Sequence, residues 1–305
     1  MKIAIIEHFT SLPPGAAPAG LVAQGRAMRD ACAADLARGA GVEVVIVGTR
    51  RAFFAALRLC DAALVIAPEE RGILAGLCRE VENRGRLLLG PASSSVRLAA
   101  DKLRTARCLA AAGVPTPRTE AVRFTDARRR LRARALPFVL KPRDGCGGRG
   151  VVVVRRTRDI DRGLAIVRRA TRRADFLAQD LAAGEAASVS LVVASRVVDL
   201  GLNRQRVRRR PAIEYLGGET YWPHDRADEG IAAARAAVAA LATAGAPLRG
   251  YVGVDLVWHA QRGPVLIEIN PRVTMAYVGL SAALNRNLAA AVLAAHQREA
   301  AHADA

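Results

Sequence analysis

Short apolar runs alternate with longer amphipathic stretches over the first 90 residues of the chain. The runs are typical of buried strands, and the stretches between them are typical of helices. Predicted strands cover residues 2–7, 42–48, 61–68 and 86–90, and predicted helices cover residues 21–38, 52–59 and 72–84. This alternation favours a parallel α/β layer, because parallel strands need a crossover connection that is usually a helix.

The pattern changes after a helix predicted over residues 93–112, which ends in a segment rich in glycine and proline. Further strands are predicted over residues 137–142, 151–155, 176–181, 187–198, 253–259 and 264–270, and further helices over residues 160–173, 231–244 and 281–297. The last two strands flank a short turn and predict a hairpin. Residues 204–219 read as a basic loop or edge region. We therefore predict an α/β chain whose second part is α+β.

A glycine-rich loop at residues 145–150 lies between two of these strands. It contains the spacing G-x-G-x-x-G, but a strand follows it, whereas a dinucleotide-binding loop opens a helix. A strand–loop–strand unit can instead fold over phosphates, because glycine lets backbone N–H groups approach them closely. Lys141, just before the loop, can meet phosphate oxygens as a compact charge. We favour a phosphate-covering loop over the alternative, a tight turn beside an exposed lysine.

The predicted hairpin carries oxygen ligands on one face. Side chains alternate along a strand, so Glu268 and Asn270 share a face, and Asp255 can join them from the partner strand. Two carboxylates and an amide oxygen suit Mg²⁺, which keeps its other positions for phosphate and water. Arg272 follows within reach of the same anion. A solvated strand face is the alternative, but a carboxylate within an apolar strand is costly unless it is paired or binds metal.

These motifs occur together, and in order, in the ATP-grasp superfamily of carboxylate–amine ligases, which the chain resembles from about residue 93 to residue 288. The matching segments are Asp101-Lys102, Phe138-Val139-Leu140-Lys141-Pro142, the glycine loop, Gln179-Asp180-Leu181 followed by Gly184-Glu185, Gly253-Val254-Asp255 and Glu268-Ile269-Asn270-Pro271-Arg272. The resemblance implies an ATP-grasp fold. An N-terminal parallel α/β pre-grasp domain, residues 1–95, would precede two α+β subdomains that enclose ATP, residues 96–183 and 184–305.

The resemblance implies that Lys102 and Lys141 contact the ATP phosphates. The glycines that would cover these phosphates are Gly147, Gly148 and Gly150. The residues that would form the hinge and read adenine, largely through the backbone, are Gln179, Asp180 and Leu181. Many relatives have two acids after the hinge glycine, and the second often holds the ribose. Here Ala186 takes that place and only Glu185 remains, so the chain departs from the pattern at the ribose contact.

The resemblance also implies that the hairpin residues Asp255, Glu268 and Asn270 bind two Mg²⁺ ions, with Mn²⁺ as a substitute. Arg272 would steady the transferring phosphoryl group or the acyl phosphate. Catalytic roles therefore fall to Arg272 and Lys141.

Further segments resemble the tyramine–glutamate ligase branch of this superfamily, which serves the biosynthesis of methanofuran-type one-carbon cofactors. They are residues 268–280, Gln24-Gly25-Arg26-Ala27-Met28, Ala187-Ser188-Val189-Ser190 and Leu202-Asn203-Arg204-Gln205-Arg206. This resemblance implies an enzyme that joins two small molecules, the carboxylate of glutamate and the amine of tyramine or a related compound, through an acyl phosphate. A ligase for amino acids or peptides is the alternative.

Candidates for the substrate carboxylate are Arg204 and Arg206, because arginine pairs bidentately with carboxylates. A solvated arginine-rich loop is the alternative for each of them. Candidates for the lining of the acceptor pocket are Tyr215, Gly217 and Gly218.

The large net positive charge of the chain changes the predicted function little. The chain has 305 residues, and 46 Lys and Arg against 28 Asp and Glu give a net charge of +18. Only Lys2, Lys102 and Lys141 are lysines, so 46 − 3 = 43 basic residues are arginine, a bias that looks like the coding preference of a GC-rich genome. Basic clusters occur at residues 128–134, 168–173 and 204–210 and keep a nucleic-acid-binding protein open as an alternative. Aromatic residues make up 4% of the chain, however, so stacking platforms are scarce, and we expect no specific nucleic-acid partner.

The five cysteines are odd in number and widely spaced, which predicts neither a disulfide framework nor a zinc site. No stretch is long and apolar enough to span a bilayer, and the N-terminus reads as a strand rather than a signal peptide. We expect a cytoplasmic enzyme without a membrane partner, and a homodimer as the common default.

Overall fold

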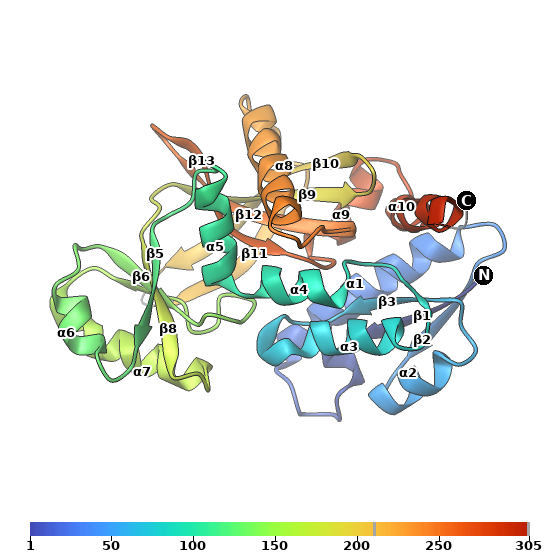
Figure 1. Cartoon of the computed structure of the whole chain (residues 1–305), viewed down its shortest axis with the longest axis horizontal. Coiled ribbons are helices and arrows are strands. Elements are labelled where there is room, and N and C mark those ends of the chain that lie inside the picture. The colour runs from blue at the N-terminus through green and yellow to red at the C-terminus, as the bar shows by residue number, and fades with distance from the viewer. Residues whose placement is uncertain (210–211, 304–305) are drawn as a thin grey trace.

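The N-terminal part of the chain folds around a four-stranded parallel sheet with helices on both faces (Figure 1). The computed structural model describes residues 1–209 and 212–303. The sheet order is β2-β1-β3-β4, with β1 at Lys2–Glu7, β2 at Glu43–Val47, β3 at Ala62–Ile66 and β4 at Leu87–Leu88. The helices that follow the first three strands are α1 (Ala19–Ala37), α2 (Arg50–Ala56) and α3 (Ile73–Glu82). The predicted parallel layer is confirmed.

Alternation along β1 places apolar side chains on both faces of this sheet. Ile3 and Ile5 pack with residues of α1, whereas Ala4 and Ile6 pack with residues of α2 and α3. All four side chains have no exposed surface, as expected for a strand covered on both sides.

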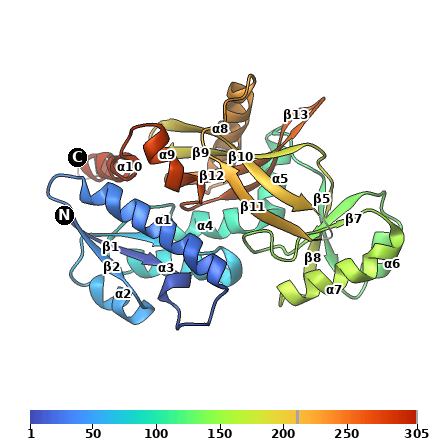
Figure 2. The ribbon, with the colours of Figure 1, turned by 180° about the vertical axis from the view of Figure 1, so that it is seen from behind.

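A second, antiparallel sheet occupies the far end of the molecule (Figure 2). Its order is β5-β8-β6-β7, with β5 at Thr119–Arg123, β6 at Phe138–Lys141, β7 at Val152–Val154 and β8 at Asp175–Asp180. Two helices, α6 (Ala127–Arg132) and α7 (Ile160–Ala170), bury one face of it through a cluster that includes Phe138 and Phe176. The predicted strand pair around the glycine loop is confirmed, because β6 and β7 are antiparallel neighbours.

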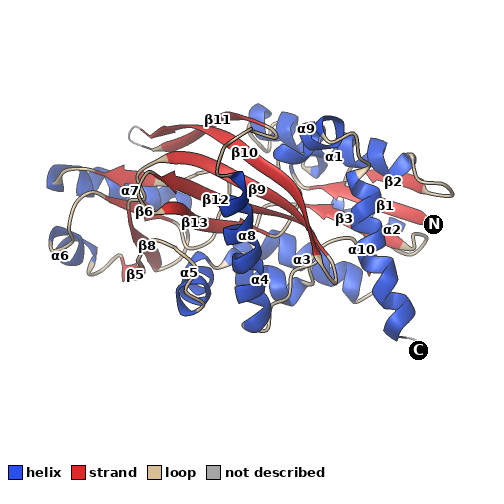
Figure 3. Cartoon of the chain, turned by 90° about the horizontal axis from the view of Figure 1, so that it is seen from above, coloured by secondary structure: helices blue, strands red, loops and turns tan. Residues whose placement is uncertain are grey.

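The third sheet is antiparallel and lies between the other two (Figure 3). Its order is β11-β10-β9-β12-β13, with β9 at Glu185–Val193, β10 at Val197–Arg209, β11 at Ile213–Glu219, β12 at Gly250–His259 and β13 at Gly263–Asn270. One face packs against α8 (Ala227–Thr243), α4 (Ser93–Ala100) and α5 (Lys102–Ala111). The other face carries the polar side chains Ser188, Ser190, Asn203, Gln205 and Asp255. The predicted hairpin is confirmed as β12–β13.

Several predicted elements differ from the observed ones. The helix predicted over residues 93–112 is two helices, because Asp101 is extended (φ −85°, ψ 95°) and its side chain caps α5. The strand predicted over residues 187–198 reverses direction after β9, where the N–H of Ala194 donates to the carbonyl of Arg196. The helix predicted over residues 281–297 is α9 (Ala276–Ala283) followed by α10 (Leu288–Ala303). The sequence pattern missed β5 and α6.

The basic segment 204–219 forms β10 and the edge strand β11, and its residues 210 and 211 lie outside the described residues. One sheet falls within each predicted domain, over residues 2–88, 119–180 and 185–270, while the boundaries themselves stay a prediction. In the described part of the chain no single helix is long and apolar enough to span a membrane. The two helical segments Ala276–Ala283 and Leu288–Gln297 together have the length and apolar composition of a membrane span, but they meet at a bend of 98°.

Candidate active site

Asp255 and Glu268 lie directly opposite each other on β12 and β13, because the register of the hairpin shifts by one residue between Asp255 and Leu256. Asn270 joins them, because its Nδ2 donates to Asp255 Oδ2 over 3.0 Å. Gln205 of β10 reaches the same carboxylate and donates to Asp255 Oδ1 over 2.9 Å. Burial, helped by the charge of Glu268, raises the pKa of Asp255 above its usual range. The three predicted metal ligands therefore lie together on the polar face of the third sheet.

Two lysines approach these carboxylates from other elements. Lys102 is the first residue of α5, directly after its cap Asp101, and its Nζ lies 2.6 Å from Glu268 Oε2. Lys141 ends β6 with only 3% of its surface exposed. Burial lowers the pKa of Lys141 to about 8, against the pull of Glu268. Burial disfavours the charge of Glu268 as well, but Lys102 and Lys141 outweigh it and hold the pKa of Glu268 below its usual range.

The glycine loop contacts α5, α7 and the start of β11. Lys102 Nζ donates to the carbonyl of Gly145 over 3.0 Å. Gly148 has φ +72°, and a Cβ there would lie 3.1 Å from the carbonyl oxygen of Ile213. Gly150 has φ +76°, and a Cβ there would lie 2.3 Å from the Cβ of Ala170. Conformation therefore favours glycine at both positions, and at Gly150 the packing against α7 also leaves no room for a Cβ.

Backbone hydrogen bonds also join the glycine loop region to the third sheet. The N–H of Ile213 donates to the carbonyl of Val151 over 2.8 Å, and an isolated antiparallel bridge pairs Val152 with Ala212. The second and third sheets are thus connected directly across the predicted phosphate site.

Arg272 follows β13 and pairs with Glu69, which comes directly before the 3₁₀ turn η2 (Glu70–Gly72) of the N-terminal part. Its Nε donates to Glu69 Oε1 over 2.9 Å and its Nη2 donates to Glu69 Oε2 over 3.2 Å. Both side chains are buried, Arg272 with 14% and Glu69 with 4% exposed. Burial disfavours the charged guanidinium, but the Glu69 carboxylate outweighs it and raises the pKa of Arg272.

The side chains of the predicted hinge are engaged away from this cluster. Gln179 is buried, and its Nε2 donates to Thr119 Oγ1 over 2.7 Å. Asp180 is exposed and pairs with Arg134. Leu181 directly follows β8 and is partly buried. The predicted reading of adenine through the backbone of these residues stays a prediction.

Glu185 and Arg204 lie on the other face of the third sheet from Asp255, Glu268 and Asn270. Arg204 is directly opposite Ala187, which packs with α8, and Glu185 shares the face of Ala187 on β9. The two residues form an ion pair with each other. The structure therefore brings together a predicted ribose contact and a predicted substrate arginine, but not beside Asp255.

Tyr215 and Arg206 lie on the same side of the third sheet as Asp255. Burial and the charge of Asp255 raise the pKa of the Tyr215 hydroxyl, whereas the charge of Arg206 lowers it. The Asp255 carboxylate and the Arg206 guanidinium therefore both lie near the Tyr215 hydroxyl. A Cβ at Gly218 would lie 3.0 Å from Tyr215 Oη, and one at Gly217 would lie 3.8 Å from Arg206 Nη2. The two glycines leave room for these side chains. In the described part of the chain Arg206 makes no ion pair.

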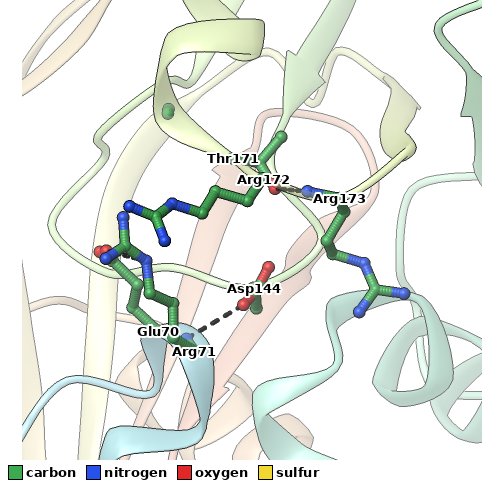
Figure 4. A pocket seen from close by; sticks show the side chains of 7 residues that line it. Glu70, Arg71, Asp144, Thr171, Arg172 and Arg173 are labelled. Carbon is green, nitrogen blue, oxygen red and sulfur yellow. Dashed lines mark hydrogen bonds and ion pairs between the residues drawn. The ribbon is translucent and has the colours of Figure 1, made fainter.

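A cavity of about 260 Å³ lies beside this cluster rather than within it (Figure 4). Its lining residues are Glu70, Arg71, Asp144, Ala170, Thr171, Arg172 and Arg173. The N–H of Arg71 donates to Asp144 Oδ2 over 3.1 Å across the cavity. The N-terminal part therefore contacts the chain just before the glycine loop.

The sequence motifs missed Glu69 and Gln205. Glu69 is 203 residues from its partner Arg272, so no local spacing could pair them. Gln205 belongs to the segment 202–206 that resembles the ligase branch, but its contact with Asp255 depends on the order of β10, β9 and β12 in the sheet.

Comparison with known proteins agrees with this geometry. A family model described as an ATP-grasp domain matches residues 99–276, and one described as a pre-ATP-grasp 3 domain matches residues 27–96. Tyramine–L-glutamate ligases of Methanocaldococcus fervens and Methanocaldococcus jannaschii are each 32% identical to the chain over 220 residues, or 72% of it. The match spans 61% and 58% of these relatives, less than two thirds of their length.

The solved structure of D-alanine–D-alanine ligase from Bacillus anthracis shares the fold. It matches with a TM-score of 0.74 over 98% of both chains at 18% identity. The superfamily and the fold that the ordered motifs predict are thereby confirmed: the chain belongs to the ATP-grasp family.

Proposed function

We propose that the chain is an ATP-dependent ligase that joins a carboxylate to an amine and releases ADP and phosphate. ATP-grasp domains bind ATP with Mg²⁺. The observation that carries the proposal is one cluster of opposite charges. Lys102 and Lys141 meet the paired carboxylates Asp255 and Glu268 directly beside a loop that has room only for glycine at Gly150.

The lysines would hold the phosphate chain of ATP, since both are directed at the carboxylate face and both are largely buried. The glycine loop, through Gly147, Gly148 and Gly150, would cover the phosphates with backbone N–H groups. The backbone of residues 179–181 would bind adenine. Glu185 is the predicted ribose contact, and its ion pair with Arg204 on the other sheet face argues for a small contribution.

The residues present fit Mg²⁺. Asn270 donates its Nδ2 to Asp255, which leaves its Oδ1 available as a ligand. The pKa of Asp255 is raised because the hydrogen bonds from Asn270 and Gln205 do not offset the burial of its carboxylate beside Glu268. A divalent cation would supply the positive charge that stabilises the ionised carboxylate. Asp255, Glu268 and Asn270 would therefore hold the metal, and the family resemblance implies two ions. Bound Mg²⁺ would neutralise phosphate charge during transfer.

The reaction would run in two balanced steps. A carboxylate oxygen of the first substrate attacks the γ-phosphorus, the bond from that phosphorus to the β–γ bridging oxygen breaks, and ADP leaves. The amine nitrogen of the second substrate then attacks the acyl carbon, the carbon–oxygen bond to phosphate breaks, and the nitrogen loses a proton. Positioning and charge neutralisation supply most of the rate in such transfers. Arg272 would stabilise the charge on the transferring group, and the closed loop would exclude water from the acyl phosphate.

Glutamate and tyramine, or a related amine, are the substrates that we propose. The two ligase relatives are named for this pair, and the quoted segments around residues 187–190, 202–206 and 268–280 support the same branch. Arg206 is exposed near the Tyr215 hydroxyl and the Asp255 carboxylate, which suits a substrate carboxylate placed next to the metal ligands.

A coupled ADP-release assay tests the proposal. The chain is given Mg-ATP and glutamate with tyramine, tyrosine, other amines or amino acids, and the amide product is identified by mass. Release of ADP that requires both substrates is expected with tyramine or a close analogue. Release with a different carboxylate–amine pair would correct the substrates, whereas no ADP release with any pair would contradict the ligase assignment.

A further inference from the structure

Glu69, a buried acid of the N-terminal part, pairs with Arg272, the residue that we place at the transferring phosphoryl group. Glu69 comes from the segment after β3, and Arg272 comes from the segment after β13. Their contact is bidentate, at 2.9 and 3.2 Å, and through it the first sheet unit reaches Arg272 in the candidate active site.

The remaining hydrogen bonds of Arg272 show which donors stay free. A guanidinium has five N–H donors in a fixed plane. Glu69 takes the side formed by Nε and Nη2, and the carbonyl of Val273 takes one donor of Nη1 over 3.2 Å. Among the described residues no further acceptor pairs with Arg272, so one N–H on Nη1 and one on Nη2 remain for an anionic oxygen. A carboxylate on one edge of the guanidinium therefore fixes the direction of the other edge.

We infer that Glu69 is a positioning residue for Arg272, which it orients toward the γ-phosphoryl group and the acyl phosphate. This inference rests on the proposed function. Glu69 does not touch the reacting atoms, and its effect passes through the guanidinium. An orientation error of about 1 Å at such a group can cost about 100-fold in rate.

Neighbouring contacts keep Glu69 itself in place. Glu70 pairs with Arg149 of the glycine loop at 2.6 Å, and the N–H of Arg71 donates to Asp144 over 3.1 Å. The segment that carries Glu69 is thus fixed at both ends of the glycine loop, so the position of Arg272 depends on the N-terminal part and on this loop together.

The variant Glu69→Gln tests the inference, because glutamine keeps the shape but loses the charge and one acceptor. We expect kcat for ADP release to fall about 10- to 100-fold, the usual range for losing an outer partner of a catalytic group, and KM for ATP to rise about tenfold because the contact with the γ-phosphate weakens. The double variant with Arg272→Lys should lose no more activity than Arg272→Lys alone, since Glu69 acts through that side chain. The matched control is Glu229→Gln, which removes the charge from a bidentate pair with Arg226 on the surface.

A binding measurement separates this inference from the proposed substrates. The ratio of the Kd of Mg-ADP to the Kd of a non-hydrolysable Mg-ATP analogue reports the contact with the γ-phosphate, whatever the acceptor is. Glu69→Gln should lower this ratio about tenfold and leave the Kd of Mg-ADP unchanged. Glu69→Asp, which keeps the charge on a shorter side chain, gives the same comparison if the glutamine variant does not fold.

An unchanged ratio and an unchanged kcat in Glu69→Gln would overturn the inference, as would losses that multiply in the double variant. Inactivity of the wild-type chain with every substrate pair would count against the proposed function alone.

Discussion

The ammonium of Lys102 lies 2.6 Å from the carboxylate of Glu268, so a predicted phosphate contact and a predicted metal ligand form an ion pair with each other. Their side chains are 11% and 22% exposed, and the pair is therefore shielded from water. Lys102 is predicted to contact the ATP phosphates and Glu268 to bind Mg²⁺. Binding of Mg-ATP would therefore replace the ion pair between them with one contact from Lys102 to phosphate and one from Glu268 to the metal. This pair thus carries no net charge before the nucleotide binds.

Glu268→Gln should abolish this exchange. The amide cannot pair with Lys102 or bind metal as an anion, so ADP release should fall about 100- to 1,000-fold, the range for losing one electrostatic group in an active site. Activity is measured with glutamate and the best amine, and Glu229→Gln serves as the surface control. Near-parental activity in Glu268→Gln would show that the metal ligands are assigned wrongly.

Lys141→Met should stabilise the nucleotide-free protein and inactivate it. The pKa of Lys141 is lowered from 10.5 to about 8, so the folded chain releases a proton that the unfolded chain keeps between these pH values. Stability of the wild type therefore rises with pH from about 8 to 10.5, and below pH 8 the buried charge costs on the order of 3 kcal/mol. Denaturant unfolding at pH 7 and pH 10 measures the difference. Lys2→Met, at an exposed pair, should change stability little. A Lys141→Met protein that is less stable than the wild type at pH 7 would contradict the prediction.

Gly150→Ala should impair the glycine loop more than Gly147→Ala. Both glycines have positive φ, at +76° and +64°, so alanine adds backbone strain of about 1 kcal/mol at either position. Only at Gly150 does the new Cβ also meet a neighbour, Ala170, at 2.3 Å, whereas Gly147 faces open space. We expect Gly150→Ala to raise KM for ATP and lower the Tm, with a smaller effect for Gly147→Ala. Equal effects would show that strain, and not packing against α7, sets the loop.

Asp101→Asn should lower stability in a pH-dependent way. The amide can still cap α5 through the N–H groups of Leu103 and Arg104, but it loses the ion pair with Arg143. Burial works against the Asp101 charge, yet Arg143 and the cap bonds lower the pKa of Asp101 below 3.8. Its contribution is therefore fully present above about pH 4 and is lost as the pH falls through the folded pKa. We expect a deficit of about 1–2 kcal/mol at pH 7.

Urea unfolding from pH 7 to pH 3 checks this deficit, which should shrink toward the acid end. Thr49→Ala is the control, because Thr49 caps α2 without an ion pair, and its deficit should not depend on pH.

The elements and contacts that were predicted from the sequence are those set by local pattern. Apolar runs mark β1 and β3 because both faces of these strands are buried. Alternation places Glu268 and Asn270 on one face of β13. The pairing of Asp255 with Glu268 also needs the register shift between Asp255 and Leu256, without which Asp255 would lie opposite Ile267. The break between α4 and α5 does not follow from the local pattern either, since it depends on Asp101 acting as a cap that also pairs with Arg143.

The contacts that could not be predicted depend on tertiary packing. Gln205 reaches Asp255 across β9, which requires the sheet order, and Glu69 reaches Arg272 between two separate sheets. The face on which Arg204 lies was also open, because a loop or edge region has no fixed alternation. Pairing of Arg204 with Ala187 on β9 decides it.

The hydrogen bond from Ile213 to Val151 ties the chain directly after the glycine loop to the start of β11 through main-chain groups. The bridge between Val152 and Ala212 adds to this connection. It is insensitive to most substitutions, because every residue except proline offers the same amide. A proline at position 213 would remove the donor, and we expect it to loosen the second sheet from the third without changing any side chain of the charged cluster.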